Sequence, residues 1–168
     1  MKHKLPICSV AVLAAVTLTA QNPGILHPEM APASGTWDHP AATLGTKPEQ
    51  PWTATTTAAG VAKTPQPGTP VAKVGEIVDF SCYLQLGKHG AAHRSCGQKC
   101  VMNSQPVGLL TQDGTLYMIM PEEHDPRRDG GADAKSKASD YMAWIVEVNG
   151  TEASHNGYRA IYVQGLTK

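Results

Sequence analysis

Residues able to bind a metal or to form a disulfide are concentrated in one short part of the chain. His93, Cys96 and Cys100 fall within eight consecutive residues, and a third cysteine, Cys82, lies shortly upstream. If residues 91–103 form a helix, positions three, four and seven apart share one face. The imidazole and the two thiols would then point the same way, so we expect this segment to be where the chain does chemistry.

A metal centre is the first interpretation of this cluster. Cys82, His93, Cys96 and Cys100 form a Cys3His set, which is a complete tetrahedral ligand set for structural zinc. Thiolates with one imidazole also suit copper(I), which is a soft ion. The predicted cofactor is therefore zinc or copper, with His89 and Met102 as spare ligand candidates.

A disulfide is the second interpretation, and the sequence leaves both open. Cβ atoms four positions apart on a helix are about 5–6 Å apart, whereas a disulfide needs about 3.5–4.5 Å. A bridge would therefore link Cys82 to Cys96 or to Cys100, stabilise the fold by roughly 2–4 kcal/mol and leave one thiol free. Redox catalysis through the cysteines is disfavoured because no thioredoxin-type Cys-x-x-Cys is present. The sequence also shows no convincing catalytic triad, carboxylate dyad or phosphate-binding loop, so it does not support an enzyme.

The first twenty residues have the pattern of a secretory signal peptide. Lys2 and Lys4 precede an apolar stretch of about sixteen residues, and small residues lead to a cleavage site after Ala20. We therefore predict export to the periplasm or the extracellular space, where disulfides are common. Cleavage would remove Cys8 and leave three cysteines. No later segment is apolar enough to span a membrane, and the net charge of zero argues against a nucleic-acid partner. The expected partner is an unidentified protein of the cell envelope.

Composition divides the rest of the chain into a linker and a domain. Residues 21–70 are rich in proline, threonine and alanine and offer few apolar side chains to bury. Such a segment does not offset the entropy lost on ordering, so we expect a disordered linker. Residues 71–168 should form one small domain.

The expected elements of this domain are mostly strands. Residues 73–86 alternate apolar and polar side chains, which predicts a long strand with Cys82 on its core face. Residues 107–111 and 115–120 flank Asp113-Gly114, a strong hairpin signal. The remaining expected elements are a helix over 91–103, a short helix over 134–140, and strands over 141–148 and 158–166. Asn149-Gly150 and Asn156-Gly157 both fit the turn between the last two strands.

This order predicts a mainly β fold. Five short antiparallel strands with a helical insertion after the first fit a small OB-like Greek-key barrel. A β-sandwich is the alternative, but it usually has about seven strands.

Several of these motifs also occur together in known sequences. The segment Gly75–Leu84, the His93-x2-Cys96-x3-Cys100 pattern, Pro106–Leu110, Asp113-Gly114 and Leu116-Tyr117 resemble a group of uncharacterised exported bacterial proteins. The resemblance covers roughly residues 74–120 and implies a small OB-like barrel, but no activity. We therefore predict an exported binding or accessory module that holds a transition metal. The alternative is a disulfide-stapled structural or interaction domain without a metal.

Overall fold

A computed structural model of the chain describes residues 30–122 and 129–166. The expected signal peptide, residues 1–20, and the first part of the expected linker, residues 21–29, lie outside the described residues. No helix within the described ranges is long and apolar enough to cross a bilayer.

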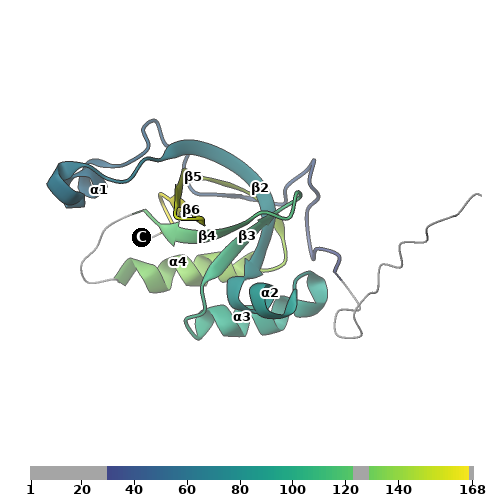
Figure 1. Ribbon diagram of the computed structural model, residues 1–168. Helices are drawn as coiled ribbons and strands as arrows, with labels where there is room; N and C mark the ends of the chain where they lie inside the picture. Colours follow the sequence, from purple (N-terminus) through teal and green to yellow (C-terminus); the bar gives the residue numbers. More distant parts are fainter. Residues whose placement is uncertain (1–29, 123–128, 167–168) are drawn as a thin grey trace, which may run out of the picture.

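A closed five-stranded barrel forms the centre of the molecule (Figure 1). Its strands are β2 (Thr69–Asp79), β3 (Val107–Thr111), β4 (Leu116–Pro121), β5 (Ile145–His155) and β6 (Tyr158–Val163). They pair in the order β2-β3-β4-β6-β5, and β5 returns to β2 to close the ring. The predicted OB-like barrel is therefore confirmed. One detail differs from the expectation, because β4 and β6 run parallel to each other.

Strand β2 closes the barrel because it is long enough to belong to both sides of it. Its first part, Thr69–Glu76, pairs with β5, and its last part, Gly75–Asp79, pairs with β3. Gly75 lies in the overlap, where a Cβ atom would meet the Leu109 side chain at 2.6 Å. Glycine at this position therefore lets the strand bend over the core without a clash.

The turns resolve what the sequence left open. Asp113-Gly114 forms the predicted β3–β4 turn, with Gly114 at φ +82°. The β5–β6 turn is Asn156-Gly157, and both of its residues have positive φ, as a two-residue hairpin loop favours. Asn149-Gly150 lies inside β5 instead. Strand β5 therefore continues to His155, seven residues beyond the expected end at residue 148.

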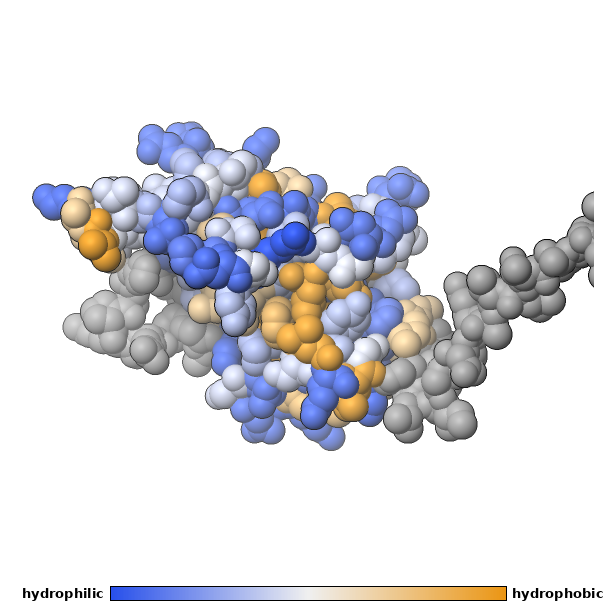
Figure 2. Space-filling model, viewed as in Figure 1, coloured by the Kyte–Doolittle hydropathy of each residue, from blue (hydrophilic) through white to orange (hydrophobic). Residues whose placement is uncertain are grey.

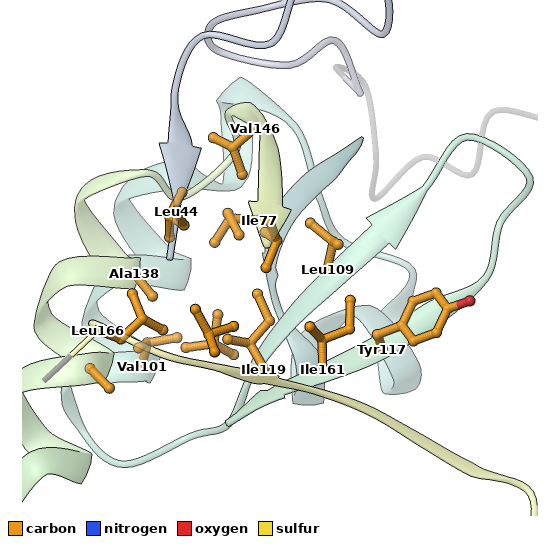
Figure 3. Close-up of a cluster of buried hydrophobic side chains, with 14 of the residues drawn as sticks. Leu44, Ile77, Val101, Leu109, Tyr117, Ile119, Ala138, Val146, Ile161 and Leu166 are labelled. Carbon is orange, nitrogen blue, oxygen red and sulfur yellow. The ribbon is translucent and has the colours of Figure 1, made fainter. Parts of the chain in front are cut away.

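Helices gather at one end of the barrel, where α2 (Phe80–Leu86), α3 (Arg94–Met102) and α4 (Asp129–Asp140) lie below the strands in Figure 1. A short 3-10 turn, Ala91–His93, leads into α3. The helical insertion after the first barrel strand is thus confirmed. The core between barrel and helices is shown in Figure 3 and includes Ile77, Val101, Leu109, Ala138, Val146 and Ile161.

The first barrel strand ends earlier than predicted. We expected a strand over residues 73–86, but β2 ends at Asp79 and a helix follows. Asp79 stops the strand because its side chain accepts hydrogen bonds from the backbone N–H groups of Ser81 and Cys82, as a helix N-cap does. Cys82 therefore lies on helix α2 and not on the core face of a strand.

Residues 30–70 are a second correction, because the expected disordered linker does not extend through them. Strand β1 (Thr43–Leu44) pairs with β5, and Leu44 is buried in the core. Helix α1 (Ala54–Ala59) and the 3-10 turn Val61–Lys63 follow. The Trp52 ring lies edge-on against Tyr162 at 5.3 Å. Backbone pairing and a few apolar anchors order this segment, so the boundary expected at residue 70 is too late.

Candidate metal centre

A carboxylate and two thiols meet where β2 passes into the helical insertion. Asp79 is the last residue of β2, Cys82 lies in the first turn of α2, and Cys100 lies near the end of α3. One ligand atom from each lies within 4.8 Å of the other two. Within the described residues, this is the group whose donors come close enough to share one metal ion.

Asp79 is fully buried and only half of its carboxylate is used. Oδ1 accepts hydrogen bonds from the backbone N–H groups of Ser81 at 3.0 Å and Cys82 at 3.3 Å. Oδ2 is buried and has no hydrogen-bond partner in the part of the chain that the structure describes. A buried carboxylate oxygen without compensation costs several kcal/mol. A cation beside Oδ2 would remove that cost.

Helix α3 brings Cys100 to this carboxylate because it packs closely at Gly97. A Cβ atom at Gly97 would lie 2.8 Å from Met142 Sδ and 3.6 Å from Asp79 Cβ. Gly97 and Cys100 are three positions apart, so they share the helix face that approaches Asp79. The missing side chain at position 97 therefore sets the distance between the thiol and the carboxylate.

Polar contacts fix α3 in this position. Arg94 donates from Nη1 to the carbonyl of Met142 at 2.6 Å and from Nη2 to that of Asp140 at 2.8 Å. Gln98 donates to the carbonyl of Ser139 at 3.1 Å. All three carbonyls belong to the end of α4 and the residues after it. These hydrogen bonds hold α3, which carries Cys100, against the C-terminal end of α4.

The surroundings hold both thiols in the protonated state at neutral pH. Burial, followed by the neighbouring Asp79 carboxylate, raises the pKa of Cys82 to about 12. The same two causes raise the pKa of Cys100, and Cys96 contributes further. Protonated thiols are poor nucleophiles, so these surroundings do not suit rapid thiolate catalysis, and attack by either sulfur requires loss of its proton first. A metal ion would bind in exchange for the two protons.

The structure brings together part of the predicted ligand set. Cys82 and Cys100 meet as expected, although Cys82 arrives from a helix. Cys96 is exposed and His93 is buried in the turn before α3, and neither belongs to the group around Asp79. His89 is directed to another residue, since its Nδ1 lies 2.9 Å from Glu76 Oε2.

Asp79 is the residue that sequence reasoning missed. A signal was present, because aspartate is among the residues preferred at a helix N-cap. The alternation of residues 73–86 favoured a continuous strand, and this hid the helix start.

The same geometry also bears on the disulfide interpretation. The sulfur atoms of Cys82 and Cys100 are within 4.8 Å of each other, while all three described cysteines are free thiols. A bridge would therefore join Cys82 to Cys100 and connect α2 with α3. The sequence analysis anticipated a bridge from Cys82 to Cys96 or Cys100, both of which lie on α3.

Comparisons with protein-family models, with curated proteins and with solved structures found no match to this chain. The resemblance to exported bacterial proteins therefore stays a prediction.

Proposed function

We propose that the protein is a small exported accessory module that holds one transition metal ion, zinc or copper(I), at Asp79, Cys82 and Cys100. The observation that carries this proposal is the buried Asp79 carboxylate. Its Oδ2 has no hydrogen-bond partner among the described residues, and one of its oxygens lies within 4.8 Å of the Cys82 and Cys100 sulfur atoms. A cation at this point would compensate the carboxylate and replace the two thiol protons. A disulfide between the two thiols would supply neither a cation nor a hydrogen-bond donor to Oδ2.

The donor set favours a borderline or soft ion. Two sulfur ligands and one carboxylate oxygen are all within the usual ligands of zinc, and the thiolates alone also suit copper(I). Hard ions such as magnesium and calcium prefer oxygen ligands throughout. Three protein ligands leave a fourth position for water or for a donor from a partner, which fits a module that exchanges its metal.

Export and a protein partner belong to the same proposal. Export is supported by the basic and apolar pattern of residues 2–20. A partner is supported by the exposed leucines of α2, Leu84 at 66% and Leu86 at 42%, which lie on the element that carries Cys82. Figure 2 shows an apolar patch over β3 and α2 in a mostly hydrophilic face.

A second candidate is a structural domain stapled by a Cys82–Cys100 disulfide. It is favoured by the proximity of the two sulfur atoms and by the oxidising compartment that export implies. Such a bridge would close a loop of roughly twenty residues and stabilise the domain by about 3 kcal/mol.

Metal analysis combined with thiol counting separates the two candidates. The exported protein, purified without chelators, should contain about one metal ion per chain if the site binds a metal. One thiol should then react with a thiol reagent in the native state, and three should react after chelation and unfolding. One reactive thiol under both conditions, no metal and a mobility shift on reduction would establish the disulfide instead.

A further inference from the structure

We propose that Cys96 is a thiolation site through which a low-molecular-weight disulfide oxidises the buried Cys82–Cys100 pair and displaces its metal. This inference rests on the proposed function for the metal, but the transfer between the three thiols stands on their arrangement alone.

Accessibility distinguishes the three cysteines. Cys96 is exposed, whereas Cys82 and Cys100 are half-buried and face the fully buried Asp79. A dissolved disulfide must reach the attacking sulfur in line with its own S–S bond, so access limits the rate. The exposed Cys96 is therefore the thiol that such a reagent meets first.

Helix geometry then gives the oxidation a route inward. Cys96 and Cys100 are four residues apart on α3, so their side chains are neighbours on one helix face. Cys100 is in turn within 4.8 Å of Cys82 through its sulfur atom. The three thiols form a path from solvent to the Asp79 carboxylate, with Cys100 in the middle.

The chemistry consists of three exchange steps. The Cys96 sulfur attacks the small disulfide, forms a mixed disulfide and releases one small thiol, which takes up the proton of Cys96. Cys100 then attacks Cys96 Sγ, and the second small thiol leaves with a proton. Finally Cys82 attacks Cys100 Sγ, and Cys96 is released as a thiol. In total, two protein thiols and one small disulfide give one protein disulfide and two small thiols.

The middle step is transient for a geometric reason. Cβ atoms four apart on a helix are about 5–6 Å apart, whereas a relaxed disulfide needs about 3.5–4.5 Å. A Cys96–Cys100 bridge is strained and hence strongly oxidising. Cys100 lies two residues before the last residue of α3, Met102, where a helix end opens most easily. The strained bridge therefore passes to Cys82.

Closure of the Cys82–Cys100 bridge removes two of the three protein ligands. A sulfur atom in a disulfide is no longer a thiolate and no longer binds the ion as one. The metal is then released. In the metal-bound protein Cys82 and Cys100 carry no protons, so two protons come from solvent: one joins the second small thiol and one joins the Cys96 sulfur released in the last step. The site would thus hold its ion under reducing conditions and lose it under oxidising ones.

The test follows zinc release from the zinc-loaded, signal-free protein after addition of oxidised glutathione. A zinc-sensitive dye reports the release, and mass mapping of quenched samples locates each disulfide. We expect glutathione first on Cys96, then a Cys82–Cys100 bridge with zinc release. Cys96→Ser should bind the same amount of zinc and release it about tenfold more slowly or slower still. Ser95→Ala, an exposed neighbour on the same helix, should behave like the unchanged protein.

The outcomes separate this inference from the proposed function. Equal release rates with and without Cys96, or glutathione found first on Cys82 or Cys100, would overturn the inference. Loss of zinc binding in Cys96→Ser would also overturn it, because Cys96 would then be a ligand. An unchanged protein that binds no zinc, yet still shows glutathione first on Cys96 and then a Cys82–Cys100 bridge, would refute the metal and retain the relay.

Discussion

The Asp79 carboxylate accepts a hydrogen bond from the backbone N–H of Cys82 at 3.3 Å and also brings a carboxylate oxygen within 4.8 Å of the Cys82 sulfur. One side chain therefore ends the first barrel strand, begins α2 and supplies the charge of the candidate metal centre. Substitutions at this residue separate the structural part from the chemical part.

Asp79→Asn keeps the capping oxygen and removes the charge. Asparagine caps helices about as well as aspartate and carries no uncompensated buried charge, so the metal-free Asp79→Asn protein should be at least as stable as the unchanged one. Asp79→Ala should have a free energy of unfolding about 1 kcal/mol below that of Asp79→Asn, because it also loses the cap. Both variants lose a ligand and should weaken zinc binding by more than the ~10–100-fold that a second-shell change costs.

Urea denaturation and a competitive zinc titration check these outcomes. Asp140→Asn, an exposed carboxylate on α4, is the matched control and should change neither quantity. Unaltered zinc affinity in Asp79→Asn would remove Asp79 from the site and with it the basis of the metal proposal.

Metal-free protein should lose stability at high pH because of Cys82. Its thiol has a pKa of about 12 in the folded protein against an ordinary value of 9.0. Between these two pH values the unfolded chain loses a proton that the folded chain retains, so the free energy of unfolding falls as pH rises. Below pH 9 the Cys82 thiol is protonated in both states, so its contribution to the free energy of unfolding is fully present.

Alkylation rates read by mass spectrometry provide the measurement. The rate at Cys82 should keep rising above pH 10, and Asp79→Asn should move that rise to lower pH because the carboxylate is one cause of the raised pKa. A rate at Cys82 that levels off near pH 9 would show an ordinary thiol.

The barrel could be predicted from the sequence because its signals are local and agree with one another. The two runs that became β3 and β4, the Asp113-Gly114 turn between them and the order of strands and helices all indicate one topology. The early end of β2 was missed because alternation continues by coincidence into α2, where Phe80 is half-buried. The N-cap of Asp79 decides the boundary, and a capping contact is visible in sequence only when the helix start is already suspected.

The order of residues 30–70 was missed for a different reason. Composition measures the apolar area that a segment can bury, but β1 is held by backbone hydrogen bonds to β5, and Trp52 by a hydrogen bond from Nε1 to the carbonyl of Gln66. Backbone pairing depends on a partner strand about a hundred residues away, and the composition of a segment carries no information on such a partner.

A side chain larger than alanine at position 97 should push α3 away from Asp79. Gly97→Ala places a Cβ against the flexible Met142 side chain, so the gain of up to about 1 kcal/mol in helix propensity should offset the local shift. Gly97→Val adds two methyl groups to the same contact and should cost about 1–3 kcal/mol. It should also weaken zinc binding, because Cys100 moves with the helix.

A matched substitution separates packing from propensity. Ser95→Val places the same side chain on the exposed face of α3 and should cost only a few tenths of a kcal/mol. Zinc affinity and urea denaturation of the three variants are the measurements. Full zinc affinity in a destabilised Gly97→Val protein would show that the position of α3 does not control the site.

Glu122 should be the residue that holds the N-terminal segment on the barrel. It is 2% exposed, and its Oε1 accepts hydrogen bonds from the Thr53 backbone N–H at 3.0 Å and from the Thr56 hydroxyl at 2.5 Å. Glu122→Ala removes the acceptor of the half-buried Thr53 backbone N–H, at a cost of about 1–3 kcal/mol. The Thr56 hydroxyl loses its side-chain partner but keeps the backbone carbonyl of residue 122 at 3.2 Å. The contact is local, so we expect faster amide exchange over residues 53–63 while β3 and β4 stay protected.

Hydrogen exchange with mass detection reads this difference directly, and zinc binding should be unaffected because Asp79 and Glu122 lie in separate contacts. Glu49→Ala, an exposed carboxylate in the same segment, is the control and should leave exchange unchanged. If exchange in Glu122→Ala rises equally in α1 and in the barrel strands, the N-terminal segment is not a separate unit but part of one cooperative fold. Unchanged exchange over 53–63 would show that β1 and Trp52 hold the segment without Glu122.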